Sequence, residues 1–403
     1  MRLTHRDRPI HLTYCTNIHA GESWDEISGS LEEYIPLVKA QLVGAGKIGA
    51  ADRFSIGLRL SGVAASALGE ASVLRAFQAQ LARLGAYVFT INAFPYGPFH
   101  GARVKEQVYQ PDWRHPERLA FTVQAARILA ELLPDGVTGS ISTVPGAFRE
   151  DGRDAGAAIA TGLFKAAAEL AALELRTGRR IVLALEPEPA CFLETVDDTL
   201  AFFHQHLTDP GARQEFAALA GTSQAHAQVL LQRHLGVCFD VCHAAVEFED
   251  PVAALGRLRA AGIAVPKIQL SCALRIPGMH AGLIDAVGRI DDGVYLHQVV
   301  ARDVGLEHYV DLPQALAAFA RGQAQGEWRI HCHVPIWMAP HGQFASTQDQ
   351  LRAVLGALGA MDPLPHLEVE TYTWDVLPAP FRDGSKADAI ARELDFVIEE
   401  LAS

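Results

Sequence analysis

The sequence lacks the features that take a protein to a nucleic acid or into a membrane. Its 403 residues include 34 lysines and arginines against 47 aspartates and glutamates, a net charge of −13, so we expect no phosphate-binding basic surface. No stretch approaches the ~20 apolar residues of a membrane span. The alanine-rich segment 155–175 is interrupted by Lys165, Glu169 and Glu174, as in a surface helix. Residues 1–8 have no apolar core, so we expect no signal peptide.

Paired cysteines and several catalytic motifs are also missing. None of the six cysteines forms a CxxC pair, and most lie in apolar runs: Cys15, Cys191, Cys238, Cys242, Cys272 and Cys332. This pattern is typical of buried free thiols in a reducing compartment, and we expect a cytoplasmic protein. The sequence contains no P-loop and no G-x-S-x-G motif, so nothing in it favours the chemistry of either.

What is present is a regular alternation of short apolar runs with longer amphipathic stretches. Nine runs have the character of buried strands: Ile10–Asn17, Phe54–Ser61, Tyr87–Ala93, Val137–Thr143, Ile181–Glu186, Leu235–Val241, Pro266–Cys272, Trp328–Val334 and Leu367–Thr373. Seven stretches have helical spacing: Leu31–Val43, Ser72–Leu84, Pro116–Leu133, Gly162–Leu175, Val252–Ala261, Leu312–Arg321 and Ala387–Leu401. The strands recur about every 45 residues, which leaves room for a strand, a loop and a helix.

This alternation predicts an α/β fold. Apolar strands between amphipathic helices indicate a parallel sheet covered on both faces. Eight such units predict a closed (β/α)8 TIM barrel, whose site lies at the carboxyl ends of its strands. Because nine strands are one too many, either one lies outside the barrel or one is not a strand. We expect a single domain over residues 1–403, with insertions near 146–160, 205–233 and 274–311.

Gly44, Gly46 and Gly49 match the dinucleotide-binding pattern G-x-G-x-x-G. That pattern binds a pyrophosphate only when a strand precedes it and a helix follows it. Here the predicted order is reversed, with the helix 31–43 before the glycines and the strand 54–61 after them. We therefore interpret the glycines as a helix end followed by a turn, and we infer no NAD.

Three acidic residues stand where apolar strands end. Glu186 and Asp240 follow such runs directly, and Glu370 shares one face of its strand with Glu368. A buried carboxylate is costly unless a cation or a hydrogen-bond donor compensates it. Three that meet at one barrel mouth would suit a divalent metal ion. The alternative for each acid is that it caps the next helix or pairs with an arginine.

Histidines are the second set of candidates. His331 and His333 are two residues apart, so both point to one side of a strand. In a barrel strand they would face the lumen and approach a metal ion; the alternative is a pair of satisfied or surface-facing polar residues. His243 follows the aspartate at 240 by three residues, and His19 lies just past the first strand as a candidate pocket residue.

The loop after the third strand carries more rings than an ordinary connection. Asn92 is followed by Phe94 and Tyr96, which alternate with prolines, and Trp374 is predicted at the same end of the barrel. Stiff aromatic side chains at a barrel mouth stack on a sugar or another flat ligand and exclude water. The alternative is a satellite core beneath a long loop.

The combination of Glu186, Asp240-x-x-His243 and Glu370 resembles the xylose isomerase-like TIM-barrel superfamily. That superfamily includes sugar isomerases and epimerases, inosose-processing enzymes and the endonuclease IV branch. The resemblance follows the barrel in strand order. It implies a divalent ion held by Glu186, Asp240, a position near Gln269 and Glu370, with His243 as a substrate contact.

The chain departs from that pattern at Gln269, where the superfamily has a histidine. An amide oxygen binds a hard cation, but more weakly than imidazole binds a transition metal; His333 on the surplus strand is the candidate substitute. The strings 13–24, 88–106 and 368–374 resemble more closely the bacterial TIM-barrel "metabolite traffic" proteins of the ebo gene cluster. That resemblance implies a cytoplasmic role in handling or exporting a secondary metabolite.

The leading hypothesis is a metal-dependent enzyme of isomerase or epimerase type that acts on a small sugar, polyol or sugar-like metabolite. Its ion would be Mn, Mg, Co or Zn, and Glu186 and Glu370 would exchange the proton. The candidate substrate contacts are His19, Asn92, Phe94, Tyr96, His243, His331 and Trp374. The alternatives are a non-catalytic barrel that binds and delivers a metabolite and, more remotely, an endonuclease IV-like phosphodiesterase, which the acidic charge disfavours.

Overall fold

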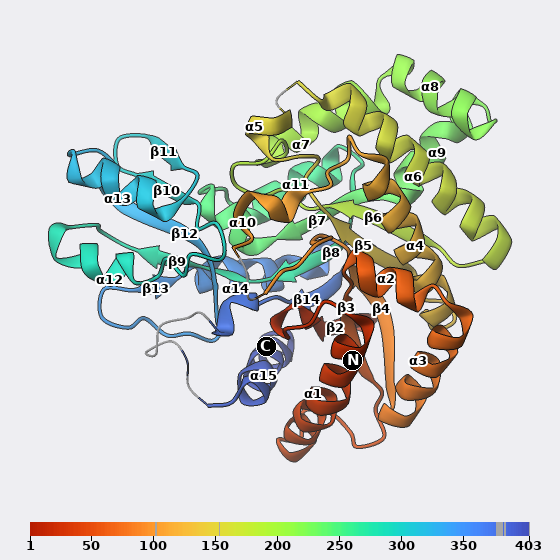
Figure 1. Cartoon of the computed structure of the whole chain (residues 1–403), viewed down its shortest axis with the longest axis horizontal. Coiled ribbons are helices and arrows are strands. Elements are labelled where there is room, and N and C mark those ends of the chain that lie inside the picture. The colour runs from red at the N-terminus through yellow and green to blue at the C-terminus, as the bar shows by residue number, and fades with distance from the viewer. Residues whose placement is uncertain (101–102, 153, 376–381, 383, 403) are drawn as a thin grey trace.

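Eight parallel strands form a closed ring in the computed structural model, which describes residues 1–100, 103–152, 154–375, 382 and 384–402 (Figure 1). They are β2 (Arg8–Tyr14), β3 (Phe54–Arg59), β4 (Ala86–Asn92), β5 (Gly139–Thr143), β6 (Ile181–Leu185), β7 (Leu235–Asp240), β8 (Ala264–Leu270) and β14 (His366–Val369). Strands β3 to β8 pair in chain order, and β14 lies between β8 and β2. A parallel bridge between Cys15 and Gly57 joins β2 to β3. The predicted TIM barrel is therefore confirmed.

Helices follow the strands, and most of them cover the outside of the barrel, as Figure 1 shows. The helices are α1 (Trp24–Gly44), α2 (Gly62–Leu68), α3 (Ala71–Leu84), α4 (Pro116–Leu132), α5 (Arg149–Gly152), α6 (Gly156–Thr177), α7 (Val196–Phe202), α8 (Pro210–Ala220), α9 (Gln224–His234), α10 (Val241–Val246), α11 (Pro251–Ala260), α12 (Ile284–Gly288), α13 (Leu312–Ala320), α14 (Gln348–Ala357) and α15 (Lys386–Ala402). All seven predicted helices are among them. Each of the seven has buried apolar residues, which explains why their spacing was visible in the sequence.

The surplus strand is β12 (Glu327–Val334), which belongs to a second sheet. This antiparallel sheet also contains β9 (Cys272–Ile276), β10 (Val299–Arg302), β11 (Leu306–Tyr309) and β13 (Ala345–Ser346), in the order β11-β10-β12-β9-β13. The sheet lies to one side of the barrel with α12 and α13 (Figure 1). A further short strand, β1 (Arg2–His5), forms a hairpin with β2.

The predicted insertion at 274–311 falls within this antiparallel sheet. The segment 205–233 contains α8 and α9, and 146–160 contains α5 and the start of α6, with residue 153 outside the described residues. Whether the chain is a single domain with these insertions stays a prediction.

The glycine-rich stretch lies at the end of α1. That helix begins after Ser23, whose side chain forms a capping box with Glu26, and it ends at Gly44. Gly46 follows with a φ of 70° in a turn that leads to β3. The stretch therefore lies after a helix and before a strand, as interpreted from the sequence, and does not form the strand-to-helix turn of a dinucleotide site.

Among the described residues, one helix, α6, is long and apolar enough to cross a membrane, judged by length and composition alone. Half of its apolar window is buried, since residues such as Leu163, Phe164 and Leu170 face the core and the helix packs against α4. Burial of one face in this way is typical of a helix that packs on the outside of a barrel. The six cysteines are buried and free, as predicted.

Inside the barrel, Lys267 and Glu368 form an ion pair at 2.7 Å with both side chains fully buried. Burial alone lowers the pKa of Lys267, but the Glu368 carboxylate together with Cys238, Cys15 and Glu186 outweighs it, and the pKa rises above its ordinary value. The backbone approaches this ion pair very closely at Gly57. A Cβ there would overlap the Glu368 carboxylate and lie 2.6 Å from the carbonyl oxygen of Tyr14, so closure of the ring between β2 and β3 requires glycine.

We expect Gly57→Ala to destabilise the barrel, because the added methyl group has no space beside the Glu368 carboxylate. Overpacking of this kind costs about 1–3 kcal/mol or more, measurable as a lower urea midpoint by circular dichroism. The matched control is Gly29→Ala in α1, where nothing lies within 4 Å of the new Cβ. That variant should be as stable as the wild type or up to about 1 kcal/mol more stable. Equal midpoints for the two variants would contradict the expectation.

Candidate functional site

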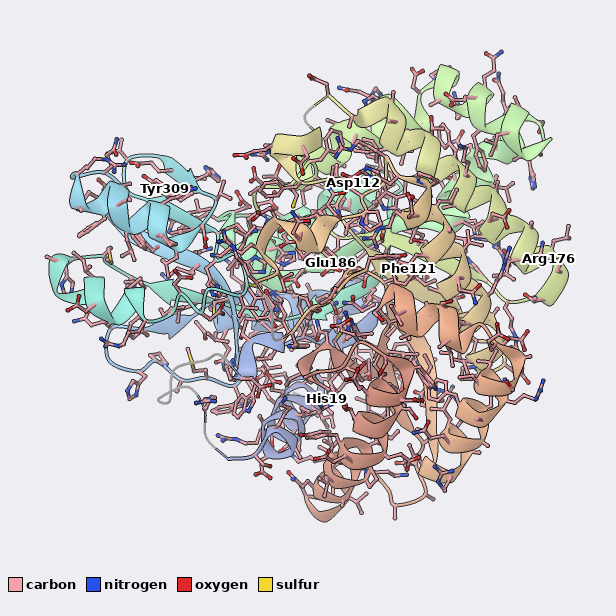
Figure 2. The ribbon with its side chains drawn as sticks, in the orientation of Figure 1. His19, Asp112, Phe121, Arg176, Glu186 and Tyr309 are labelled. Carbon is pink, nitrogen blue, oxygen red and sulfur yellow. The ribbon has the colours of Figure 1, made fainter. Side chains whose placement is uncertain are left out.

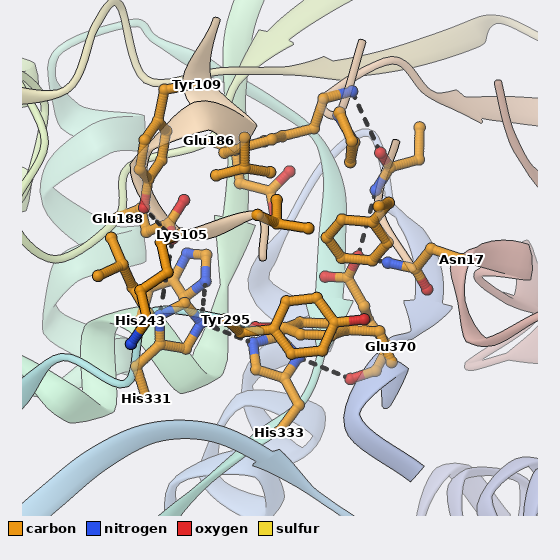
Figure 3. Close-up of a pocket in the computed structure, with 18 residues that line it drawn as sticks. Asn17, Lys105, Tyr109, Glu186, Glu188, His243, Tyr295, His331, His333 and Glu370 are labelled. Carbon is orange, nitrogen blue, oxygen red and sulfur yellow. Dashed lines mark hydrogen bonds and ion pairs between the residues drawn. The ribbon is translucent and has the colours of Figure 1, made fainter. Parts of the chain in front are cut away.

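The barrel strands end in a pocket where the antiparallel sheet meets the barrel mouth (Figure 3). Its cavity measures about 60 Å³, room for a few water molecules. Its walls are Asn17, Asn92, Phe94, Pro95, Phe99, Val104, Lys105, Val108, Tyr109, Glu186, Glu188, His243, Tyr295, Leu296, His331, His333, Glu370 and Tyr372. Figure 2 places the labelled Glu186 over the middle of the molecule, whereas Tyr309 lies out in the antiparallel sheet.

The structure brings the three predicted acids together. Glu186 follows β6, Asp240 ends β7 and Glu370 follows β14, so all three lie at the carboxyl ends of the strands. They offer oxygen atoms that lie within 4.8 Å of one another. Among the described residues, none of the three forms an ion pair with a lysine or an arginine. The alternative of an arginine partner for each is therefore wrong.

The hydrogen bonds of the three acids leave buried oxygens unpartnered. Oδ1 of Asp240 accepts from the backbone N–H of His243 (3.0 Å) and from the Ser271 hydroxyl (2.7 Å), so the helix-cap alternative holds for this one oxygen. Oδ2 of Asp240 and Oε2 of Glu186 have no hydrogen-bond partner among the described residues. An orphaned carboxylate oxygen inside a protein needs a cation or a donor, and two of them in one group fit a divalent ion.

Glu370 is oriented by two amides. Its Oε1 accepts from Nδ2 of Asn17 at 2.7 Å and from Nδ2 of Asn92 at 3.2 Å. Asn92 was a candidate substrate contact. The structure places it on the pocket wall, where it also donates this hydrogen bond to Glu370. Asn17 was missed as a site residue, although it lies directly after the first strand, as the three acids do after theirs.

Burial and mutual repulsion shift the proton affinities of these acids. Burial raises the pKa of Glu186 well above its ordinary value, and the neighbouring Glu370 and Asp240 carboxylates raise it further. The pKa of Glu370 is raised by the same two causes, with Asp240 and Glu368 as its neighbours. Burial opposes the charge of Asp240 as well, but His243, His333 and its hydrogen bonds prevail and hold its pKa below the ordinary value.

Three histidines meet beside Glu186 and Glu370, as Figure 3 shows. The Nε2 atom of His331 lies 3.2 Å from Nε2 of His243 and 3.2 Å from Nε2 of His333. Nε2 of His243 and of His333 lie 3.8 Å and 3.9 Å from Oδ2 of Asp240. Burial and the neighbouring histidines lower the pKa of His331, and burial lowers that of His333 to about 4. His331 and His333 belong to β12, so they reach the barrel mouth from a strand outside the barrel.

Gln269 lies on the barrel interior but not on the pocket wall. It shares a face of β8 with Lys267, whose side chain points into the barrel. Both its amide oxygen and its amide nitrogen are buried without a partner among the described residues. Its role as a metal ligand stays a prediction.

Three predicted contacts are not brought to the pocket, because each belongs to local packing. The His19 ring stacks on Tyr34 at 4.2 Å between centroids and lines a separate small hollow. Tyr96 packs edge-on against Phe121. Trp374 is buried in the short helical turn Tyr372–Asp375. By contrast Phe94 and the three histidines do line the pocket.

Three aromatic rings line one part of the pocket, and we call them the aromatic roof. Phe99, Tyr295 and Tyr372 pack with ring centroids 5.2–5.3 Å apart, and they come from the loop after β4, the segment before β10 and the turn after β14. Lys105 joins the same loop to the antiparallel sheet region through ion pairs with Asp311 and, at 3.8 Å, with Asp291.

Comparison with known proteins finds only solved structures of low sequence identity. No protein-family profile and no curated protein matches it. Among solved structures it is similar to a D-tagatose 3-epimerase-like protein (13% identity, TM-score 0.48, covering 98% of this chain and 100% of that one) and to the IOLI protein with a bound zinc atom (13%, 0.47, 98% of each). A xylose isomerase-like TIM-barrel protein from Mycobacterium smegmatis in complex with magnesium is also similar (12%, 0.44, 99% and 98%). Neither a ligand nor a reaction transfers at this level, and the resemblance to the metabolite traffic proteins stays a prediction.

We predict a pH-dependent effect of Glu186→Gln in chelator-treated protein. A carboxyl whose pKa is raised on folding stabilises the fold only while it is protonated, so stability is lost as the pH rises above the ordinary value of 4.5. The variant cannot ionise. It should therefore gain stability relative to the wild type between about pH 5 and pH 8, by up to about 1.4 kcal/mol for each step of one in pH.

The measurement is the difference in urea midpoint between variant and wild type across this pH range. Glu33→Gln, on the exposed side of α1, serves as control and should run parallel to the wild type. A Glu186→Gln difference that stays constant with pH would contradict the raised proton affinity of Glu186.

Proposed function

We propose that this protein is a divalent-metal-dependent TIM-barrel enzyme that acts on a small sugar, polyol or sugar-like metabolite, with isomerase- or epimerase-type proton transfer. The observation that supports it is the convergence of Glu186, Asp240 and Glu370 within 4.8 Å at the barrel mouth. These oxygens suit Mg²⁺ or Mn²⁺, which prefer carboxylate ligands.

The fit to a metal ion rests on charge and on unpartnered atoms. Three carboxylates at this spacing repel one another strongly in a buried site. Two of them keep an oxygen with no hydrogen bond, and no lysine or arginine among the described residues pairs with any of the three. A bound divalent ion would offset most of this negative charge and would stabilise negative charge on neighbouring substrate oxygens.

The chain's own residues then supply the acid and base. Glu186 and Glu370 both line the pocket, and a carboxylate is one of the side chains that take and return protons in catalysis. We propose that Glu186 takes the proton from a substrate carbon next to a carbonyl group, and that Glu370 returns one. Asn17 and Asn92 hold Glu370 in place through their amides. Once the substrate is in, the aromatic roof would exclude water.

The metal part of this proposal predicts that Glu186→Gln and Asp240→Asn bind Mn²⁺ at least about 10–100-fold more weakly than the wild type. Each removes a carboxylate from the converging group. Free Mn²⁺ in a titration of the purified protein is measured by electron paramagnetic resonance.

The matched control is Glu393→Gln. Glu393 is equally buried, but its Oε1 already accepts from the Thr371 hydroxyl (2.6 Å) and the Ile336 N–H (3.2 Å), so its loss should leave Mn²⁺ binding unchanged. Wild-type affinity in both site variants would exclude a metal ion at this position.

The chemical part predicts exchange of a substrate carbon-bound proton with solvent. A panel of small ketoses, aldoses and inososes is incubated with Mn²⁺-loaded protein in D₂O, and deuterium uptake next to the carbonyl is followed by NMR. Glu186→Gln and Glu370→Gln should each lower the exchange rate by about 10²–10⁴-fold. Binding of a sugar by the wild type with no exchange at any carbon would instead favour the binding-and-delivery barrel.

A further inference from the structure

A larger cavity lies at the other end of the barrel, where the strands begin. It measures about 340 Å³, against about 60 Å³ at the barrel mouth, and small-molecule sites span about 300–1,000 Å³. Its walls include the first residues of β5, β8 and β14, one face of α11 and the segment after α14. We call it the basal cavity. Its polar lining residues are Thr138, Arg180, Arg259, Asp362 and His366, and the others are apolar or glycine.

One face of α11 is open to the basal cavity. Val252, Leu255, Gly256 and Arg259 line the cavity at spacings of three and four residues, so they share this face. Val252 is 39% exposed, and a Cβ at Gly256 would meet nothing within 4 Å. The first three residues of β8, 264–266, also line the cavity and are only half-buried, whereas the rest of that strand is buried. Burial of this apolar surface by a ligand would be favourable.

His366 lines the cavity from inside the barrel. Its Nδ1 lies 2.8 Å from the Ser140 hydroxyl oxygen. Thr90 donates its own proton to the Ser140 carbonyl oxygen (3.2 Å), so its Oγ1 accepts from the Ser140 hydroxyl (2.8 Å). The Ser140 oxygen therefore accepts from Nδ1–H of His366.

The other nitrogen of His366 is a bare acceptor. Burial lowers the pKa of His366 well below its ordinary value, and His11 and Lys267 lower it further, so the ring is neutral. With the proton on Nδ1, Nε2 carries a lone pair, and it has no hydrogen-bond partner among the described residues. A lone pair repels a carboxylate, so the inner end of the cavity disfavours a negative group.

Two arginines supply positive charge at the cavity wall. Arg259 of α11 donates to the carbonyl oxygen of Ala360, another wall residue. Arg180, just before β6, donates to the carbonyl oxygen of Arg233 from two of its nitrogens, at 3.1 Å and 3.3 Å. Within the described ranges, neither Arg180 nor Arg259 forms an ion pair with a carboxylate.

The acids nearest to these arginines have partners of their own. Asp362 has a side chain that is 93% exposed, and it lies 3.9 Å from Arg8. Glu174, which acts on the charge of Arg180, accepts from Arg233 at 2.7 Å and lies 3.3 Å from His234. The cavity thus combines an apolar wall and a neutral inner end with two arginines that lack a carboxylate partner.

We propose that the basal cavity binds a small apolar carboxylic acid, with its carboxylate at Arg180 and Arg259 and its apolar body between α11 and the first residues of β8. A guanidinium group binds a carboxylate more strongly than it binds a neutral group. His366 disfavours the opposite orientation, with the carboxylate inside the barrel. The proposal does not depend on the proposed catalytic function, because it uses the other end of the barrel and none of the residues of the pocket.

The test is calorimetric titration of the full chain with two acids, octanoate and 4-phenylbutanoate, and with 1-octanol as the uncharged counterpart. The wild type should bind one of the acids at a single site, and 1-octanol about 10-fold more weakly than octanoate. Arg180→Gln should lower the affinity for the acid about 10-fold and leave that for 1-octanol unchanged. Arg176→Gln, at an exposed position of α6 outside the cavity, is the control and should bind as the wild type.

Gly256→Leu tests the location of the site. The new side chain would extend from the cavity face of α11 and should weaken the binding of acid and alcohol alike at least about 10-fold. Leucine is also the better helix former, so the variant should fold. Gly356→Leu in α14 is the matched control, because its Cβ likewise meets nothing within 4 Å and the residue does not line the cavity.

The outcomes decide between this site and adventitious binding. Acid binding that weakens in both Arg180→Gln and Gly256→Leu, but in neither control, supports the proposal. Absence of binding of both acids below about 1 mM overturns it. It is also overturned if 1-octanol binds as tightly as octanoate, or if acid binding persists unchanged in either cavity variant.

Discussion

The repulsion among three buried carboxylates is the constraint on which the rest of the barrel mouth depends. Glu186, Asp240 and Glu370 come from three strands and meet within 4.8 Å, where water screens their charges poorly. The surrounding protein supplies amides to Glu370 and a hydroxyl and a backbone N–H to Asp240, but, among the residues described, no ion pair with a lysine or an arginine. Deeper in the barrel, by contrast, Glu368 has its own lysine. The carboxylates without a lysine or arginine partner are thus those at the barrel mouth, where the proposed cation would bind.

Most of the fold could be predicted from the sequence, because buried parallel strands and amphipathic helices have distinct apolar spacing. The barrel strands and the seven expected helices are observed. The exception was β12, whose apolar run looks like that of a barrel strand. Apolar spacing shows that a strand is buried but not which neighbours it pairs with, and β12 pairs antiparallel with β10 and β9. The short strands β10, β11 and β13 gave no signal at all, since two to four residues are too few to show a period.

The site could be predicted only where residues mark the ends of strands. Parallel strands place such residues at one edge, which is why the three acids and Asn92 meet. Gln298 gives no such signal, since it lies before a strand of another sheet and contacts His331 through its amide oxygen. His19 shows the opposite error: it follows a barrel strand, but its ring turns away to stack on Tyr34. Position along the chain predicts which edge a residue reaches, whereas its rotamer depends on packing.

The central claim is that the carboxylates of Glu186, Asp240 and Glu370 share one cation. The most direct measurement is anomalous diffraction from crystals of the full chain grown with Mn²⁺, with data collected on both sides of the manganese absorption edge. The account predicts an anomalous peak within coordination distance of all three carboxylates, at about 2.0–2.6 Å from their oxygens. Fully occupied density for the three side chains with no peak between them, at a Mn²⁺ concentration that saturates carboxylate sites, would contradict it.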